Sequence, residues 1–115
     1  MRITTVILDS ADPAKLAEFY RSALGWEPSY SDDTYVFLGT KDAARLGFQK
    51  VEGYRGPSWP EERVHAHVDF EVPDVAEAVA TFVSLGATKP DHQPGGDDWT
   101  VLLDPEGHPF CVMPD

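Results

Sequence analysis

In one segment of each half of the chain, apolar residues recur every three or four positions, the spacing of a helix with one buried face. In the first half these residues are Leu16, Phe19, Tyr20 and Leu24, and in the second half they are Val75, Val79, Phe82 and Leu85. A β-branched run at residues 3–9 precedes the first segment, and an alternating run at residues 64–72 precedes the second. Both halves therefore carry a strand followed by a helix, which indicates an internal repeat.

Both predicted helices have matching signals at their ends. Asp12 and Asp74 precede the first helical positions, where a carboxylate can accept a hydrogen bond from a free backbone N–H. Pro13 suits the first turn, because its missing N–H costs nothing there. Gly25 and Gly86 follow the last apolar positions and favour the left-handed conformation that ends a helix.

Further short β-like runs follow each helix. They cover residues 26–30, 34–38 and 45–51 in the first half and residues 88–92, 99–103 and 110–113 in the second. Residues 52–63 are rich in glycine and proline and have no periodicity, which is typical of a connector. The pattern predicts an α+β protein of two βαβββ modules in pseudo-twofold arrangement, with helices on one side of a curved, partly open antiparallel sheet. We expect a single domain over residues 1–115, with its modules at about 1–52 and 64–115.

Composition narrows the classes of function. The 115 residues carry a net charge of −11, and such a field repels nucleic-acid phosphates and anionic lipids. No apolar run approaches the roughly 20 residues that span a bilayer, and the start of the chain does not resemble a secretory signal. Cys111 is the single cysteine, which excludes an intramolecular disulfide and a cysteine-rich zinc site. We therefore expect a cytoplasmic protein that binds neither nucleic acid nor membranes.

The strand at residues 64–72 carries the clearest candidate site. Because strand side chains alternate, its four ionisable residues share one face, and the apolar residues between them must meet the helix. The four are His65, His67, Asp69 and Glu71. Groups spaced about 7 Å apart could present two imidazoles and a carboxylate to a divalent metal. Without a metal, Asp69 or Glu71 paired with His67 could serve as a general base. A solvated face of an acidic protein explains the same spacing equally well.

The chain resembles the vicinal oxygen chelate superfamily, which includes glyoxalase I, extradiol dioxygenases, and bleomycin- and fosfomycin-resistance proteins. Three stretches carry the resemblance: LDSADPAKLAEFYRSALGW at Leu8–Trp26, HVDFEVPD at His67–Asp74 and DPEGHPFC at Asp104–Cys111. Together they span essentially the whole chain, and they are most similar to the small glyoxalase-like domain proteins. The resemblance implies the glyoxalase/bleomycin-resistance/dioxygenase fold, whose members include enzymes and proteins that only bind.

The resemblance also implies where a metal would lie. Catalytic members hold a divalent metal with residues from the first and last strand of each module, typically histidine, glutamate or glutamine. Those positions fall on Thr5, on His67, on Cys111 and near Gln49. Threonine and cysteine replace two usual donors, so the resemblance implies a degenerate site with no firmly held cofactor, and at most a weakly bound divalent metal on His67 and Gln49. A Cys111 thiolate could bind a soft metal, although a lone buried thiol more often packs as a small hydrophobe.

Aromatic residues complete the predicted ligand site. Trp59 lies in the connector and Trp99 follows a glycine-rich loop, so both are expected to wall a pocket for an aromatic molecule. The predicted ligand-binding set is Thr5, Gln49, Trp59, His67, Asp69, Trp99 and Cys111. His92 and His108 are expected to be solvated loop residues.

Three functions compete. The favoured one is a protein that holds a small hydrophobic or aromatic molecule in the cleft between its modules without transforming it, as drug-sequestering relatives do. The alternative is a lyase, isomerase or dioxygenase that uses an incomplete or shifted metal site around His67, with His67 and Asp69 as candidate catalytic residues. A third is a self-association or protein-interaction domain. Because relatives of this fold commonly pair and sheet edges invite pairing, we also expect a homodimer.

Overall fold

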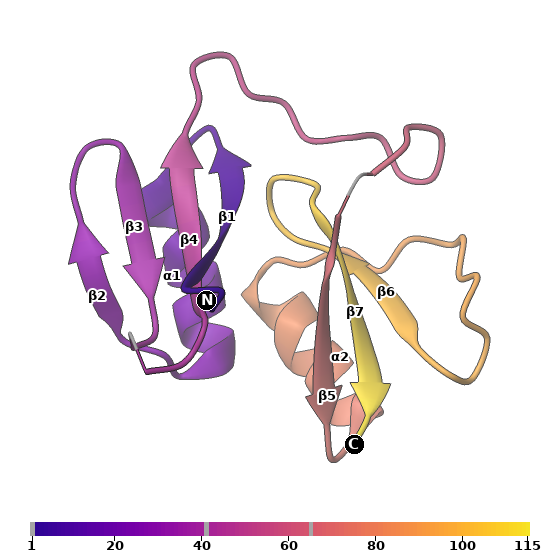
Figure 1. Ribbon diagram of the computed structural model, residues 1–115. Helices are drawn as coiled ribbons and strands as arrows, with labels where there is room; N and C mark the ends of the chain where they lie inside the picture. The colour runs from indigo at the N-terminus through magenta and orange to yellow at the C-terminus, as the bar shows by residue number, and fades with distance from the viewer. Residues whose placement is uncertain (1, 41, 65) are drawn as a thin grey trace. The chain divides into compact units, whose positions relative to one another are not determined.

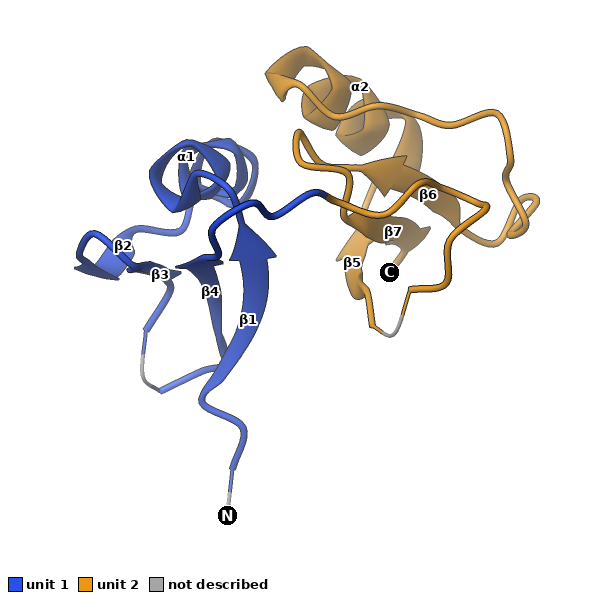
Figure 2. Ribbon diagram, turned by 90° about the horizontal axis from the view of Figure 1, so that it is seen from above, with its two compact units in different colours: residues 1–55 blue, residues 56–115 orange. Residues whose placement is uncertain are grey.

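A computed structural model describes residues 2–40, 42–64 and 66–115 (Figure 1), so the predicted strand position His65 lies outside the described residues. The chain divides into two compact units, residues 1–55 and 56–115 (Figure 2). The boundary between them lies within the predicted connector. Each unit places one helix over one face of its own sheet, so the predicted α+β class and the repeat are confirmed.

The first unit contains one helix and a four-stranded sheet. Its elements are β1 (Thr5–Ser10), α1 (Pro13–Leu24), β2 (Pro28–Ser31), β3 (Tyr35–Leu38) and β4 (Arg45–Lys50), with strand order β1-β4-β3-β2. As predicted, Asp12 Oδ1 accepts a backbone N–H in the first turn at 3.2 Å, and Gly25 ends the helix with a φ of 70°. The buried face of α1 includes Leu16 and Tyr20, and the Tyr20 ring stacks on Phe48 of β4 with centroids 5.3 Å apart.

The second unit repeats this plan with a three-stranded sheet. Its elements are β5 (Val68–Val72), α2 (Val75–Leu85), β6 (Thr100–Leu103) and β7 (Pro109–Pro114), with strand order β5-β7-β6. Asp74 caps α2 and Gly86 ends it with a φ of 118°, as predicted. Phe82 of α2 packs on Phe70 of β5 and Phe110 of β7, with ring centroids 5.7 and 4.8 Å away. These contacts confirm that the apolar face of β5 meets the helix.

The sheets are mixed, which corrects the predicted antiparallel sheet. β1 pairs with β4 in parallel, and β5 pairs with β7 in parallel, while the remaining pairs are antiparallel. The helix after the first strand returns the chain to its starting end. In the first unit β2 then runs in the same direction as β1, and two reversals bring β4 alongside β1 in parallel. In the second unit β6 runs opposite to β5, and one reversal brings β7 alongside β5 in parallel.

The predicted strand at residues 88–92 does not form. Thr88 makes an isolated antiparallel bridge to Leu103 of β6. Further along, the Gln93 side chain takes over the role of a neighbouring strand: its Nε2 donates to the Val101 carbonyl at 2.9 Å, and its Oε1 accepts the Val101 N–H at 2.8 Å. Pro90 lies between the two contacts and has no N–H to give to a ladder. β5 is also shorter than predicted and begins at Val68.

Across the described parts of the chain, neither helix has the length and apolar character needed to cross a membrane.

Candidate ligand pocket in the second unit

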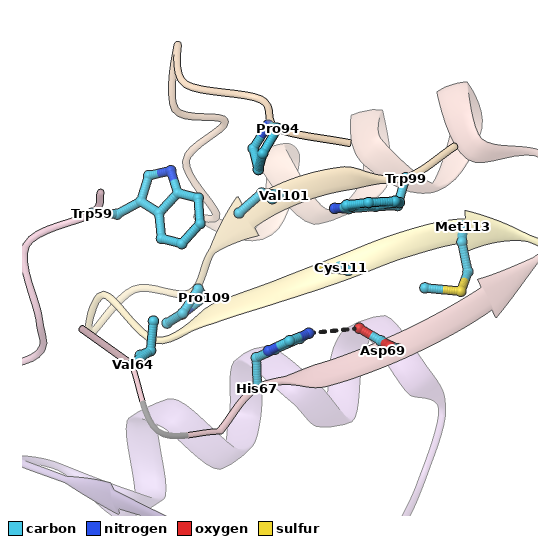
Figure 3. Close-up of a pocket in the computed structure, with 10 residues that line it drawn as sticks. All are labelled: Trp59, Val64, His67, Asp69, Pro94, Trp99, Val101, Pro109, Cys111 and Met113. Atoms are coloured by element: carbon cyan, nitrogen blue, oxygen red, sulfur yellow. Dashed lines mark ion pairs between the residues drawn. The ribbon is translucent and has the colours of Figure 1, made fainter. Parts of the chain in front are cut away.

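A pocket of about 400 Å³ lies on the sheet of the second unit, on the face that α2 does not cover (Figure 3). Among the described residues, all those that line it belong to the second unit, residues 56–115. The lining residues are Trp59, Val64, His67, Asp69, Pro94, Trp99, Val101, Pro109, Cys111 and Met113. Most of these residues lie at every second position of a strand or of the short segment that leads into it. This spacing follows because a strand places every second side chain on the same face.

One row of paired residues forms the floor of the pocket. Asp69 of β5 lies opposite Cys111 of β7, and Cys111 lies opposite Val101 of β6. Directly paired residues point to the same face of a sheet, so these three side chains share the pocket face. The adjacent positions Phe70 and Phe110 point to α2 instead. The alternation predicted for residues 64–72 therefore places His67 and Asp69 in the pocket.

His67, Asp69 and Cys111 form one polar cluster. The His67 Nε2 lies 3.2 Å from the Asp69 Oδ1 (Figure 3), and both side chains are about half exposed. One donor atom from each of the three residues lies within 4.8 Å of the other two. This cluster joins an imidazole, a carboxylate and a thiol at one point on an otherwise apolar floor.

The environment of Cys111 keeps its thiol protonated. Burial raises the pKa of the Cys111 thiol to about 11, and the negative charge of Asp69, which also takes part in a hydrogen bond with the thiol, adds to the rise. A thiol with this pKa is almost entirely protonated at neutral pH. Because the thiolate is the nucleophilic form, Cys111 is a poor nucleophile in this state.

Two indole rings stand beside the floor (Figure 3). Trp99 precedes β6 and remains 38% exposed. Its ring lies so close to Gly95 that a Cβ there would come within 2.5 Å of it, so the absence of a side chain at Gly95 lets the loop pass beside the indole. Trp59 is held from the other side, where its indole N–H donates to the His92 carbonyl at 3.2 Å. Both predicted aromatic walls therefore line the pocket.

The two predicted ligand residues of the first unit do not come together. Arg45 of β4 donates two hydrogen bonds to the Thr5 hydroxyl, at 3.2 and 3.0 Å from its Nε and Nη2. Gln49 pairs instead with Asp9, four positions along the β1–β4 ladder from the Thr5–Arg45 pair. At about 3.3 Å per residue, this separation is roughly 13 Å.

This geometry tests the metal positions that the resemblance implied. A guanidinium that binds the Thr5 hydroxyl holds a positive charge where a metal would have to lie. Thr5 and Gln49 are too far apart to share one ion, so this part of the four-position set does not fit a metal. The donors that do converge are those of the polar cluster, and one of them, Asp69, is outside that set.

Some pocket residues were missed from the sequence. Pro109 and Met113 share the pocket face with Cys111, and Val101 extends it onto β6. Period-two alternation from Cys111 along residues 109–113 could have found the first two. Val64 and Pro94 carry no such signal, because both lie outside regular elements.

The prediction that His108 is a solvated loop residue is wrong. Its side chain is buried, and its Nδ1 lies 2.7 Å from the Asp104 Oδ2. Asp104 Oδ1 also accepts the backbone N–H groups of Glu106 and His108, so one buried carboxylate organises the whole turn. From the sequence alone, a histidine that follows a Pro-Glu-Gly turn is expected to be exposed. The only sequence signal for the burial of His108 is its partner Asp104, four residues earlier.

Comparison with known proteins supports the fold. The sequence profile of the glyoxalase-like domain family matches residues 5–113. Curated protein sequences give no significant match. A glyoxalase/bleomycin resistance protein/dioxygenase family enzyme from Burkholderia phytofirmans is similar in structure, with a TM-score of 0.74, 22% identity and coverage of 97% of each chain.

Two further solved structures share the fold. A glyoxalase/bleomycin resistance protein from Albidiferax ferrireducens has a TM-score of 0.69 at 19% identity, with 98% of each chain covered. The trypanothione-dependent glyoxalase I of Leishmania major has a TM-score of 0.70 at 21% identity, with 99% of this chain and 86% of that chain covered. At these identities the likeness establishes the fold alone.

Proposed function

Because the chain belongs to the glyoxalase-like domain family, within the vicinal oxygen chelate superfamily, we propose that it binds a small hydrophobic or aromatic molecule in the pocket of its second unit. The observation that carries this proposal is the union of two indole walls and one polar cluster around the same space. Ligand pockets typically combine a mostly apolar lining with a few placed polar groups.

The pocket sets the size and chemistry of the proposed ligand. A volume of about 400 Å³ lies at the lower end of the roughly 300–1,000 Å³ typical of ligand pockets, which suits a molecule of one or two rings. Val101, Pro109 and Met113 offer apolar contact to the ring, and Trp59 or Trp99 offers a face for stacking. His67 and Asp69 would orient one polar group of the ligand through hydrogen bonds.

We favour binding without chemical change, as in sequestration of a drug-like compound. Covalent catalysis in the pocket would need a reactive nucleophile. The thiol of Cys111 is protonated and therefore a poor nucleophile, which supports binding without chemical change. An enzyme of lyase or isomerase type is the second candidate. It is favoured by the 3.2 Å contact between His67 and Asp69, in which a carboxylate could hold an imidazole in position to move a proton.

A fragment titration tests the proposal. Tryptophan fluorescence and NMR shifts are followed while one- and two-ring aromatic compounds, each with one polar substituent, are added to the full chain. We expect binding that shifts the signals of Trp99 and Met113. The Trp99→Ala variant should weaken it at least about tenfold, or roughly 1.4 kcal/mol, because a stacking ring is lost.

Trp26→Ala is the matched control. Trp26 is 40% exposed, close to the 38% of Trp99, but it is not part of the pocket lining. Equal losses in both variants, or no loss in Trp99→Ala, would place the ligand elsewhere. Conversion of a bound compound to product, lost in Asp69→Asn, would favour the enzyme. Failure of every fragment to bind, together with self-association, would favour an interaction domain.

A further inference from the structure

The face of the first unit's sheet that α1 does not cover carries one row of paired residues. Ile7 of β1 pairs with Gly47 of β4, Gly47 pairs with Phe37 of β3, and Phe37 pairs with Tyr30 of β2. Directly paired residues point to the same face, so this row lies opposite to Phe48, which packs against α1. Ile7 and Tyr30 are 44% and 48% exposed, so both ends of the row offer apolar contact to a ligand.

The absence of a side chain at Gly47 lets the Phe37 ring lie across β4. A Cβ at Gly47 would lie 2.7 Å from the Phe37 ring and 3.1 Å from the Thr5 methyl group. Tyr30 and Tyr35 contact the same ring, with centroids 5.6 and 5.8 Å away. Phe37 is therefore the centre of an aromatic surface that begins beside Thr5.

Arg45 of β4 places its guanidinium on this surface. Its Cζ lies 5.0 Å from the centroid of the Phe37 ring, within the range of a cation–π contact. Its Nε and Nη2 both donate to the Thr5 hydroxyl, so one side of the guanidinium is fixed. A guanidinium has five N–H groups, and the end formed by Nη1 and Nη2 presents the parallel pair that binds a carboxylate through both of its oxygens.

Within the described parts of the chain, no carboxylate neutralises Arg45. None of the ion pairs between described residues includes it. Asp9, which shares this face on β1, lies four positions from Thr5, or roughly 13 Å along the strand. In a chain of net charge −11, a positioned arginine without such a partner is a local positive site that can attract an anion.

We propose that Arg45 binds the carboxylate of a small aromatic acid, whose ring packs on Ile7 and Phe37 of the same face. The two N–H groups at the end of the guanidinium donate to the two carboxylate oxygens. Thr5 is a positioning residue, since its hydroxyl fixes the plane of the guanidinium. The site lies wholly within the first unit, and it needs neither a metal nor the ligand proposed for the second unit.

The chemistry of this face selects the class of ligand. The planar fork of arginine matches a planar carboxylate, and the aromatic surface around Phe37 gives contact area to a ring. A bare inorganic anion gains only the first contact, and a neutral aromatic compound gains only the second. The pocket of the second unit disfavours the same acid, because the Asp69 carboxylate on its floor repels an anion.

Titration of the full chain with a naphthoate, followed by amide NMR shifts, tests the proposal. We expect saturable shifts at Gly47 and Phe37, and binding at least about fivefold tighter than that of the matching neutral naphthamide. Added salt should weaken binding of the acid and leave binding of the amide unchanged, since only the acid binds through charge. Inorganic sulfate should bind more weakly than the acid, because it has no ring to pack on the face.

Arg45→Gln should weaken naphthoate binding at least about tenfold, because hydrogen bonds to a charged group are lost. Arg45→Lys should weaken it at least about threefold, since an ammonium keeps the charge and lacks the fork. This variant is decisive if circular dichroism shows that Arg45→Gln fails to fold. Lys50→Gln is the matched control: it removes one positive charge from β4 on the opposite face, and it should keep the affinity within about twofold.

Two substitutions of Thr5 test its positioning role. Thr5→Val keeps the shape and removes the hydroxyl, so naphthoate binding should weaken at least about threefold. Thr5→Ser restores the hydroxyl and should restore the affinity, which a purely structural role for the residue would not require. Trp99→Ala should bind naphthoate normally, which separates this site from the pocket of the second unit.

Other results would overturn the site. These are no naphthoate binding, equal affinity for the naphthamide or for sulfate, equal weakening in Lys50→Gln, or shifts confined to Trp99 and Met113. The last result would place the acid in the pocket of the second unit and leave Arg45 without a ligand.

Discussion

At the scale of single residues, the pairing of His108 with Asp104 changes which substitutions should matter. The two side chains meet at 2.7 Å in a buried turn, and the Asp104 carboxylate is fully buried. A buried carboxylate that loses its partner keeps the cost of its burial without the compensating contact. A histidine in the loop before β7 is therefore a structural residue and not a silent surface position.

We expect His108→Ala to lower the free energy of unfolding by about 2–3 kcal/mol. This is somewhat below the roughly 3–5 kcal/mol lost when other buried pairs are broken, because Asp104 still accepts two backbone N–H groups. Urea denaturation gives the measurement. His92→Ala, at an exposed loop position, should stay within about 0.5 kcal/mol of wild type. A wild-type midpoint for His108→Ala would contradict the structural role.

Reasoning from the sequence could predict the placement of side chains where that placement depends on neighbouring residues alone. The alternation of residues 64–72 placed His67 and Asp69 on one face without any knowledge of their neighbours. The same reasoning could not see that Arg45 would bind Thr5, because that contact depends on the register of two strands forty residues apart. For the same reason it could not pair Asp69 with Cys111.

At the scale of elements, the edge of β6 is completed by a side chain. The Gln93 amide exchanges two hydrogen bonds with the backbone of Val101, a residue that is 2% exposed, and it donates a third to the Pro90 carbonyl. The loop that carries Pro94 and leads to Trp99 begins at this point. The Gln93 amide therefore anchors one side of the pocket as well as the strand.

We expect Gln93→Ala to destabilise the chain by about 1–3 kcal/mol, because it leaves the Val101 N–H and carbonyl without their partner. Hydrogen exchange at the Val101 amide should accelerate more than exchange at Leu103, whose N–H is bonded to the Thr88 carbonyl instead. Asp91→Ala, at an exposed position of the same loop, is the control. Unchanged protection of Val101 in Gln93→Ala would show that the amide is not the anchor.

The elements themselves were predictable to different degrees. Helix ends followed from Asp12 and Gly25, and from Asp74 and Gly86, because capping depends on a few adjacent residues. The parallel pairing of the first and last strands did not follow, since hydrophobic alternation is the same in parallel and antiparallel strands. The replacement of a strand by the Gln93 side chain could not be predicted from the hydrophobic pattern. That pattern records only whether a residue is apolar or polar, and not which hydrogen bonds its side chain makes.

At the scale of the whole molecule, the repeat was predictable and its functional asymmetry was not. In both units a helix follows the first strand, as the duplicated pattern indicated, and the first strand pairs in parallel with the last. The equivalent positions diverge in chemistry: Thr5 is bonded to Arg45, whereas His67 joins a cluster with Asp69 and Cys111. The two units thus share one backbone plan, and the polar cluster of His67, Asp69 and Cys111 belongs to the second unit.

We expect two chains to associate as a symmetric homodimer. The sheets end in edge strands, β1 and β2 in the first unit and β5 in the second, whereas the edge of β6 is already bonded to Gln93 and Thr88. A strand edge offers backbone groups for pairing with another chain. Isologous pairing is the commonest way in which identical chains satisfy such groups. Light scattering over a hundredfold range of concentration should give twice the mass of one 12.7 kDa chain, falling towards a single chain only on strong dilution. A monomer mass that does not change with concentration would contradict this assembly, and the pocket of the second unit would then have to work within one chain.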